Sequence, residues 1–74
     1  MSNSVTSRLG DVINGYVVVT QYKDEVILAE AINPENPDKA VVWRLDYEGE
    51  PYSGGYFSNL LSAQKEFSKR AFGW

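Results

Sequence analysis

Two apolar segments rich in β-branched and aromatic residues, 16–22 and 25–32, follow each other with only Lys23-Asp24 between them. Such residues favour extended backbone, where their side chains pack on a pleated surface. Two strands that are joined by so short a polar link must run antiparallel, because a parallel pair needs a long crossover connection. The sequence therefore predicts an antiparallel hairpin over residues 16–32.

A third strand is predicted over residues 40–47, after a loop that contains two prolines and two asparagines, 33–38. Its residues alternate between a mainly apolar set and a mainly polar set: Val41, Trp43, Leu45 and Tyr47 against Val42, Arg44 and Asp46. A half-buried strand turns its charges toward water, so we expect the first set to face the core.

The C-terminal third combines a short strand with a helix. Residues 52–57 predict a fourth strand, in which Gly54-Gly55 marks a bulge or a tight bend. Ser58 is the predicted N-cap, and Gly73 the predicted helix stop. The helix places apolar side chains along one stripe: Leu60, Ala63, Phe67 and Ala71, widened by Leu61.

These elements predict an α+β fold in which a small antiparallel sheet of three or four strands packs against one C-terminal helix. Residues 1–12 form a polar N-terminal arm, and residues 13–74 form a single α+β domain. Trp43 and Phe67 are expected to meet where the strand and the helix face each other. With 74 residues, the chain is long enough for one small core.

The composition excludes several kinds of chemistry. There is no cysteine and no histidine, which removes disulfides, thiolate catalysis, the usual zinc sites and an imidazole base. The Gly54-Gly55 pair lacks the further glycines and nearby lysine of a phosphate-binding loop, since the next lysine is Lys65. The acidic residues do not follow the twelve-residue calcium-loop pattern. We therefore expect no enzyme activity, no cofactor and no bound metal.

The longest apolar runs are far shorter than the roughly 20 residues of a membrane span, and residues 1–8 lack the apolar core of a signal peptide. We expect no membrane partner and a cytoplasmic location. The net charge of −3, with acidic residues clustered at 46–50, makes nucleic acid a less favoured partner than protein.

The predicted hairpin is apolar on both faces, and one helix covers only one of them. The period of two places Tyr16 and Tyr22 on the same face. Either that face or the face with Val17 and Val19 stays partly exposed, unless the N-terminal arm or a second copy of the chain covers it. Because exposed apolar patches usually mark partner surfaces, Tyr16 and Tyr22 are candidate partner-binding residues. Trp74 either folds back on the core or binds a partner.

Three parts of the C-terminal half share a pattern with other small proteins: a strand with a tryptophan at 41–46, the segment Gly55-Tyr56-Phe57, and a helix with Ala63, Phe67 and Arg70. Over about residues 40–72 the chain resembles small uncharacterised proteins of Gram-positive phages and mobile elements. Phage proteins of this size often inhibit a host or defence machine, anti-CRISPR proteins being one group. The resemblance implies this context, in which the cytoplasmic location would be the host cytoplasm, and it implies no functional site.

Three functional hypotheses follow. The leading one is a non-enzymatic protein-interaction module that inhibits a host or defence protein acting on nucleic acids. Its acidic residues would face a basic groove of the target: Asp46, Glu48 and Glu50, with Glu30. The second hypothesis is a single-stranded nucleic-acid binder that uses Lys65, Lys69, Arg70 and exposed tyrosines. The third is a structural domain that self-associates, for example as a homodimer.

Overall fold

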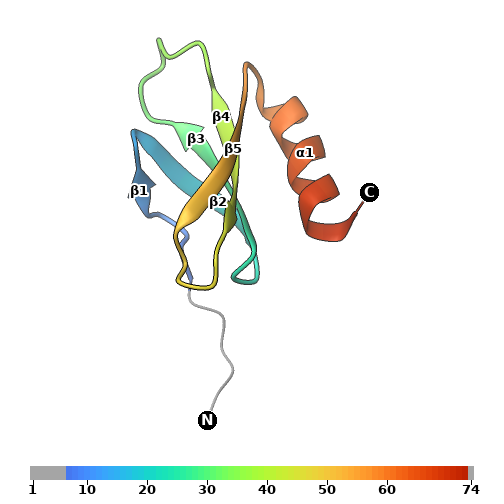
Figure 1. Ribbon diagram of the computed structural model, residues 1–74. Helices are drawn as coiled ribbons and strands as arrows, with labels where there is room; N and C mark the ends of the chain where they lie inside the picture. Colours follow the sequence, from blue (N-terminus) through green and yellow to red (C-terminus); the bar gives the residue numbers. More distant parts are fainter. Residues whose placement is uncertain (1–6, 74) are drawn as a thin grey trace.

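A computed structural model describes residues 7–73, which form one antiparallel sheet and one helix (Figure 1). In chain order the elements are β1 Val12–Ile13, β2 Tyr16–Tyr22, β3 Val26–Ala31, β4 Ala40–Leu45, β5 Pro51–Phe57 and α1 Leu60–Phe72. The strands lie in the sheet in the same order as in the chain, and every neighbouring pair is antiparallel. The sheet is curled like half of a barrel, with α1 against its outer face.

The predicted α+β class and the C-terminal helix are confirmed, but the strand count was too low. The described residues contain a fifth strand, β1, whose Val12 and Ile13 pair with Val17 and Tyr16. The link is Asn14-Gly15, and both residues have positive φ values, 51° and 84°. That backbone suits a two-residue hairpin turn. A two-residue strand carries too little periodic signal to be seen in the sequence.

The sheet has a separate apolar core on each face. The core under α1 consists of Val26, Leu28, Ala40, Val42, Ala63 and Phe67. The core on the inner, concave face consists of Tyr16, Val18, Ile27, Ala29, Val41, Trp43 and Leu45. The central strands β3 and β4 are thus covered on both sides, which explains why their apolar runs are nearly continuous.

This arrangement corrects two predictions about the third strand. Trp43 and Phe67 do not meet, because they lie in the cores on opposite faces of the sheet. Val42, assigned to the solvent side, is fully buried against the helix. The prediction allowed one buried face per strand, whereas β4 is covered by the helix outside and by the curl of the sheet inside.

Aromatic rings close the inner face. Tyr16 from β2 contacts Trp43 from β4 and Tyr56 from β5, with ring centroids 6.1 and 5.9 Å apart in edge-to-face geometry. Trp43 and Tyr56 meet in the same way at 6.4 Å. Because β2 and β5 are not hydrogen-bonded neighbours, a contact between their side chains requires the sheet to curl. The sheet therefore covers its own inner face.

A bulge in β2 separates the two tyrosines that the sequence placed on one face. The pairing with β3 shifts register between Val18 and Thr20, so Val19 is an extra residue on the bulged strand. Beyond this point every side chain changes face. Tyr16 therefore points into the inner core, whereas Tyr22 packs beside the helix and meets Phe72 edge-to-face at 4.7 Å.

β5 also contains a bulge, one residue before the predicted position: Ser53 and Gly54 lie opposite Trp43, whereas Gly55 pairs with Val42. The register with β4 shifts between Val42 and Arg44, and Ser53 adopts a positive φ of 58°. Gly54 lies under the Trp43 indole, where a Cβ atom would come within 2.7 Å of Nε1. Gly55 leaves space for Arg70, whose guanidinium donates to the carbonyl oxygens of Ser53 and Val42. Both glycines therefore allow a neighbouring side chain to pack closely against the β5 backbone.

Replacing Gly54 by alanine is expected to lower the free energy of unfolding by about 1–3 kcal/mol, because the rigid Trp43 ring cannot move away without disturbing the inner core. Urea denaturation followed by circular dichroism measures the effect. Gly55→Ala is the matched comparison, since its new Cβ would meet the flexible end of Arg70 at 3.3 Å and the Phe57 ring at 3.4 Å, which is close to ordinary contact. A larger loss for Gly55→Ala than for Gly54→Ala would contradict this account.

The helix begins one residue later than predicted. Asn59, not Ser58, is the N-cap, and its side-chain oxygen accepts a hydrogen bond from the Ser62 amide at 2.8 Å. Gly73 ends the helix as predicted, in a left-handed conformation with its amide bonded to the Lys69 carbonyl. Of the predicted stripe, Ala63 and Phe67 are buried, whereas Leu60 and Leu61 are exposed.

Candidate functional site

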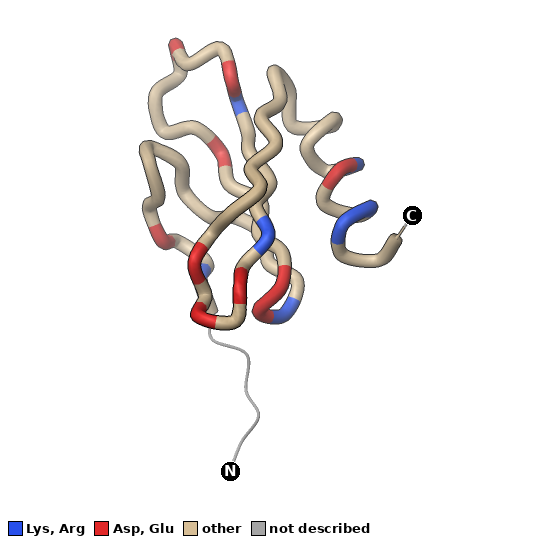
Figure 2. Tube along the Cα trace, viewed as in Figure 1, with Lys and Arg blue, Asp and Glu red and all other residues tan. Residues whose placement is uncertain are grey.

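Two turns lie side by side at one end of the sheet, the β2–β3 turn at 23–25 and the β4–β5 turn at 46–50. A hydrogen bond from the Leu45 amide to the Glu25 carbonyl joins their bases. Acidic residues gather at this end of the molecule (Figure 2). They are Asp24 and Glu25 from the first turn and Asp46, Glu48 and Glu50 from the second. We call this surface the acidic end.

The β4–β5 turn is held in shape by the Asp46 side chain. Its Oδ1 accepts hydrogen bonds from the amides of Glu48 and Glu50, both at 2.9 Å. The Asp46 amide donates to the Glu50 carbonyl, and the Gly49 amide donates to the Asp46 carbonyl. An aspartate at the start of a turn commonly bonds the backbone two residues on. Asp46 thus orders the turn, while the carboxylates of Glu48 and Glu50 are left to face outward.

Tyr47 stands at the tip of this turn, with 96% of its surface exposed. The alternation of the third strand predicted it to face the core, and that prediction was wrong. β4 ends at Leu45, so Tyr47 follows the conformation of the turn instead of the pleat of the strand. A tyrosine in this position offers a large apolar ring and a hydroxyl group to any molecule that approaches the acidic end.

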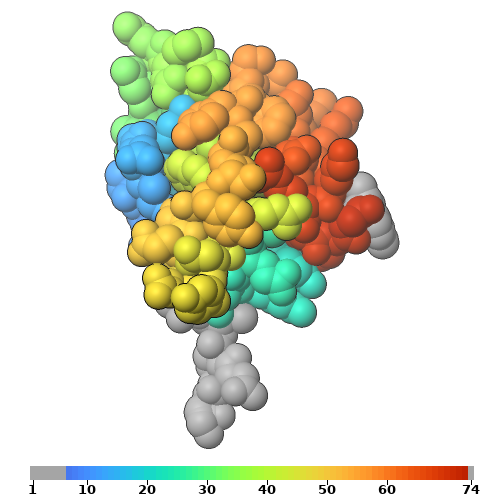
Figure 3. All heavy atoms as spheres, in the orientation of Figure 1, coloured from blue at the N-terminus to red at the C-terminus, as the bar shows by residue number. Residues whose placement is uncertain are grey.

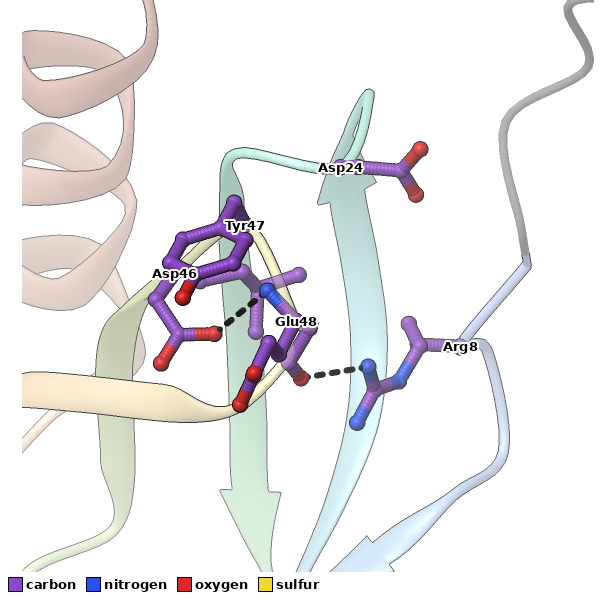
Figure 4. A pocket seen from close by; sticks show the side chains of 7 residues that line it. Arg8, Asp24, Asp46, Tyr47 and Glu48 are labelled. Carbon is purple, nitrogen blue, oxygen red and sulfur yellow. Dashed lines mark hydrogen bonds between the residues drawn. The ribbon is translucent and has the colours of Figure 1, made fainter.

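A shallow pocket of about 270 Å³ lies beside the turn and is lined by Arg8, Asp24, Leu45, Asp46, Tyr47, Glu48 and Gly49. In Figure 4, Arg8 reaches toward the turn from the opposite wall. Its Nη1 donates to the Gly49 carbonyl at 2.7 Å, and its Nε bonds Asp11 at 3.2 Å. The cationic group of Arg8 is therefore already used within the molecule.

Arg8 also fixes the segment that precedes β1. Its backbone amide donates to Gln21 Oε1 at 2.7 Å, and two further backbone hydrogen bonds link Gly10 and Asp11 to Val18. Residues 7–11 of the predicted polar arm therefore lie against β2, and Val12 belongs to β1. The arm's first six residues lie outside the described part of the chain.

The structure places the other predicted partner-binding residues away from the acidic end. Glu30 lies near the opposite end of β3, where it pairs with Val17 and Ala40. Tyr16 is buried, and its hydroxyl donates to the Asp38 carbonyl and accepts from Asn36. Tyr22 is partly buried beside α1, and Lys23 lies over its ring. Trp74 lies outside the described residues.

Of the basic residues of the nucleic-acid hypothesis, Lys65 and Lys69 are exposed on α1, whereas Arg70 is bonded within the molecule. Arg70 bonds Glu66 at 2.7 Å and two carbonyl oxygens of the sheet, so its charge stabilises the packing of α1. Among residues 7–73 no group of three or more acidic side chains is placed to hold a metal ion. Within the same residues, no helix has the length and apolar character to cross a bilayer.

Sequence reasoning found Asp46, Glu48 and Glu50 but missed their neighbours. Asp24 and Glu25 carried a usable signal, because alternate turns of an antiparallel meander lie at the same end of the sheet. Arg8 carried no such signal in the sequence, since its contact with Gly49 joins residues 41 positions apart. Comparison of the chain with protein-family models, with curated proteins and with solved structures finds no match.

Proposed function

We propose that this chain is a small non-enzymatic module that binds a protein partner through its acidic end. The observation that carries the proposal is Tyr47, which projects almost fully exposed from a turn that Asp46 holds in shape. Tyrosine is enriched among residues that dominate binding energy at protein interfaces. A preformed turn lowers the entropy lost on binding.

The charges of the acidic end define the chemistry of the partner. Glu48 and Glu50 follow Tyr47 in the chain, and Asp24 lies on the facing wall of the pocket. Carboxylates around an aromatic ring favour a surface rich in arginine and lysine, because the ring can stack on a guanidinium while the carboxylates pair with it. The partner is therefore a basic protein surface.

A nucleic-acid-processing protein of a host or of a defence system offers such a surface in its nucleic-acid groove. The resemblance to phage and mobile-element proteins favours this class of target, and the chain would act as an inhibitor by occupying the groove. The apolar inner face of the sheet has no part in this proposal, because the curl of the sheet closes it.

Capture of protein partners from a bacterial host lysate tests the proposal with matched variants. We expect Tyr47→Ala and the double variant Glu48→Gln, Glu50→Gln each to reduce capture of a specific partner about tenfold or more. Glu35→Gln is the control, because Glu35 is an exposed acidic residue in the 33–38 loop, away from the acidic end. All variants should keep the wild-type unfolding midpoint, since the replaced side chains are exposed.

The captured partner should be basic, and its nucleic-acid binding should fall when the chain is added. A partner retained equally by the wild type and by both acidic-end variants would refute the proposal. Loss of capture with Glu35→Gln to the same extent would also count against it, because net charge alone would then explain binding.

A further inference from the structure

The β1–β2 turn, Asn14-Gly15, contains two residues that can react with each other. Both residues are exposed, and both have the positive φ values of a two-residue hairpin turn. The turn lies at the end of β2 opposite the acidic end. In Figure 3 the blue atoms of this N-terminal region lie uncovered at the left edge of the molecule. Solvent therefore reaches the turn.

The backbone nitrogen of Gly15 is available as a nucleophile. Among the backbone hydrogen bonds of residues 7–73, the Gly15 carbonyl accepts one from the Ile32 amide at 3.0 Å, and the Gly15 amide donates none. Gly15 has no side chain, and nothing beyond its chain neighbours lies within 4 Å of where a Cβ atom would stand. An N–H that is unbonded and uncovered can lose its proton to solvent base, and the nitrogen can then attack the neighbouring side-chain amide.

The other asparagines of the described chain lack this combination. Asn33 and Asn36 each precede a proline, whose nitrogen has no proton to lose. Asn59 caps the helix, where its side-chain oxygen accepts a hydrogen bond from the Ser62 amide at 2.8 Å. Asn14 thus differs from them both in the residue that follows it and in its surroundings.

We propose that Asn14 is a deamidation site that changes the backbone of the β1–β2 turn. The Gly15 nitrogen, after losing its proton to solvent base, forms a bond to Cγ of Asn14. The bond from Cγ to the side-chain nitrogen breaks, and that nitrogen takes a proton from water and leaves as ammonia. Water then opens the resulting cyclic imide. Opening at Cγ gives aspartate, whereas opening at the backbone carbonyl gives isoaspartate, whose main chain runs through Cβ and Cγ.

The turn can reach the geometry for ring closure because β1 is easily separated from β2. β1 is an edge strand, and its pairing with β2 consists of Val12 with Val17 and Ile13 with Tyr16. Short elements at the edge of a structure open locally at a lower free energy than the whole domain. Ring closure therefore does not require the sheet to unfold, and it does not depend on a partner at the acidic end.

Isoaspartate disrupts the hairpin more than aspartate does. It lengthens the main chain of a turn whose two residues fit the pairing of Ile13 with Tyr16. The longer turn also moves the Gly15 carbonyl away from the Ile32 amide. Aspartate adds the same negative charge without lengthening the backbone, and Asp-Gly suits this kind of turn. The isoaspartate form therefore loosens β1 and uncovers Ile13, which packs against the inner core.

Incubation of the full chain in mildly alkaline buffer, followed by peptide mapping with mass spectrometry, tests the site. We expect aspartate and isoaspartate to accumulate at Asn14 at a rate that rises with hydroxide concentration, while Asn33 and Asn36 stay intact. The reference is a blocked peptide of residues 10–19, in which the turn is unfolded. Conversion in the protein should be slower than in the peptide by less than about a hundredfold, because the edge strand opens locally.

The variant Asn14→Asp is the matched control for the structural consequence, because it has the charge of the product and a backbone of normal length. We expect the isoaspartate form, once separated by chromatography, to show faster amide hydrogen exchange over residues 12–22 than this variant. Its midpoint of urea unfolding should also be lower, whereas Asn14→Asp should keep the midpoint of the wild type.

Two outcomes would overturn the proposal. The first is conversion at Asn14 that is slower in the protein than in the peptide by more than about a hundredfold, since the turn would then open only with the whole domain. The second is equal hydrogen exchange and an equal unfolding midpoint for the isoaspartate form and Asn14→Asp, which would show that the added charge, and not the longer backbone, determines the effect.

Discussion

Replacing Phe67 by alanine is expected to lower the free energy of unfolding by about 3–5 kcal/mol, the usual cost of truncating a buried aromatic side chain. Phe67 is the largest helix residue in the outer core, where it packs with Val42 and Leu28. A domain of this length has a total stability of roughly 4–11 kcal/mol, so most of it would be lost. Urea unfolding, followed by circular dichroism at the helix minimum, measures the change.

Leu61→Ala is the matched control, because Leu61 lies on the same helix with 63% of its surface exposed. We expect its unfolding midpoint to stay close to that of the wild type. If Phe67→Ala also unfolds at the wild-type midpoint, the helix is not docked on the outer face of the sheet as described.

Trp43→Ala is expected to lower the free energy of unfolding by a similar amount, about 3–5 kcal/mol, for a different reason. Trp43 belongs to the inner core, and its ring supports both Tyr16 and Tyr56 across the curl of the sheet. Its removal takes away the central ring of this aromatic group. Trp43→Phe should recover part of the lost stability, because a smaller aromatic ring still fills some of the space. Urea denaturation measures both variants.

Tyr52→Ala is the comparison for this second prediction, since it removes an aromatic ring of β5 that is half exposed. We expect its loss of stability to be clearly smaller than that of Trp43→Ala. Equal losses for the two variants would show that the inner aromatic group contributes no more than an ordinary surface ring.

Much of the fold could be predicted because its signals are local. The short link at Lys23-Asp24, the period of two in β4 and the stripe that includes Ala63 and Phe67 each depend on a few neighbouring residues. Gly73 could be predicted for the same reason, since a helix end needs a residue that accepts a left-handed backbone.

Two of the errors arise from features that involve distant residues, and a third from a local choice of helix cap. The bulge at Val19 changes the face of Tyr22, yet nothing in the alternation of β2 reveals an extra residue. The curl of the sheet, completed by Tyr16 and Tyr56, buries an inner face that a flat sheet would expose. Ser58 and Asn59 both have side chains that can cap a helix, so only the backbone geometry chooses between them.

The candidate site was predictable in part. The acidic residues 46–50 are visible as a cluster in the chain, whereas the exposure of Tyr47 depends on where β4 ends. The close approach of Gly54 to the Trp43 indole depends on the path of β5. Both features require the three-dimensional arrangement of two strands.

The order of the strands has a consequence for how the chain folds. Each strand pairs with the strand that precedes it, so the sheet forms without any long crossover. Proteins dominated by contacts between nearby parts of the chain fold fast, because little loop entropy is lost before each pairing. A chain leaving the ribosome could therefore assemble hairpin by hairpin and add the helix last, with little time spent in partly folded forms that aggregate.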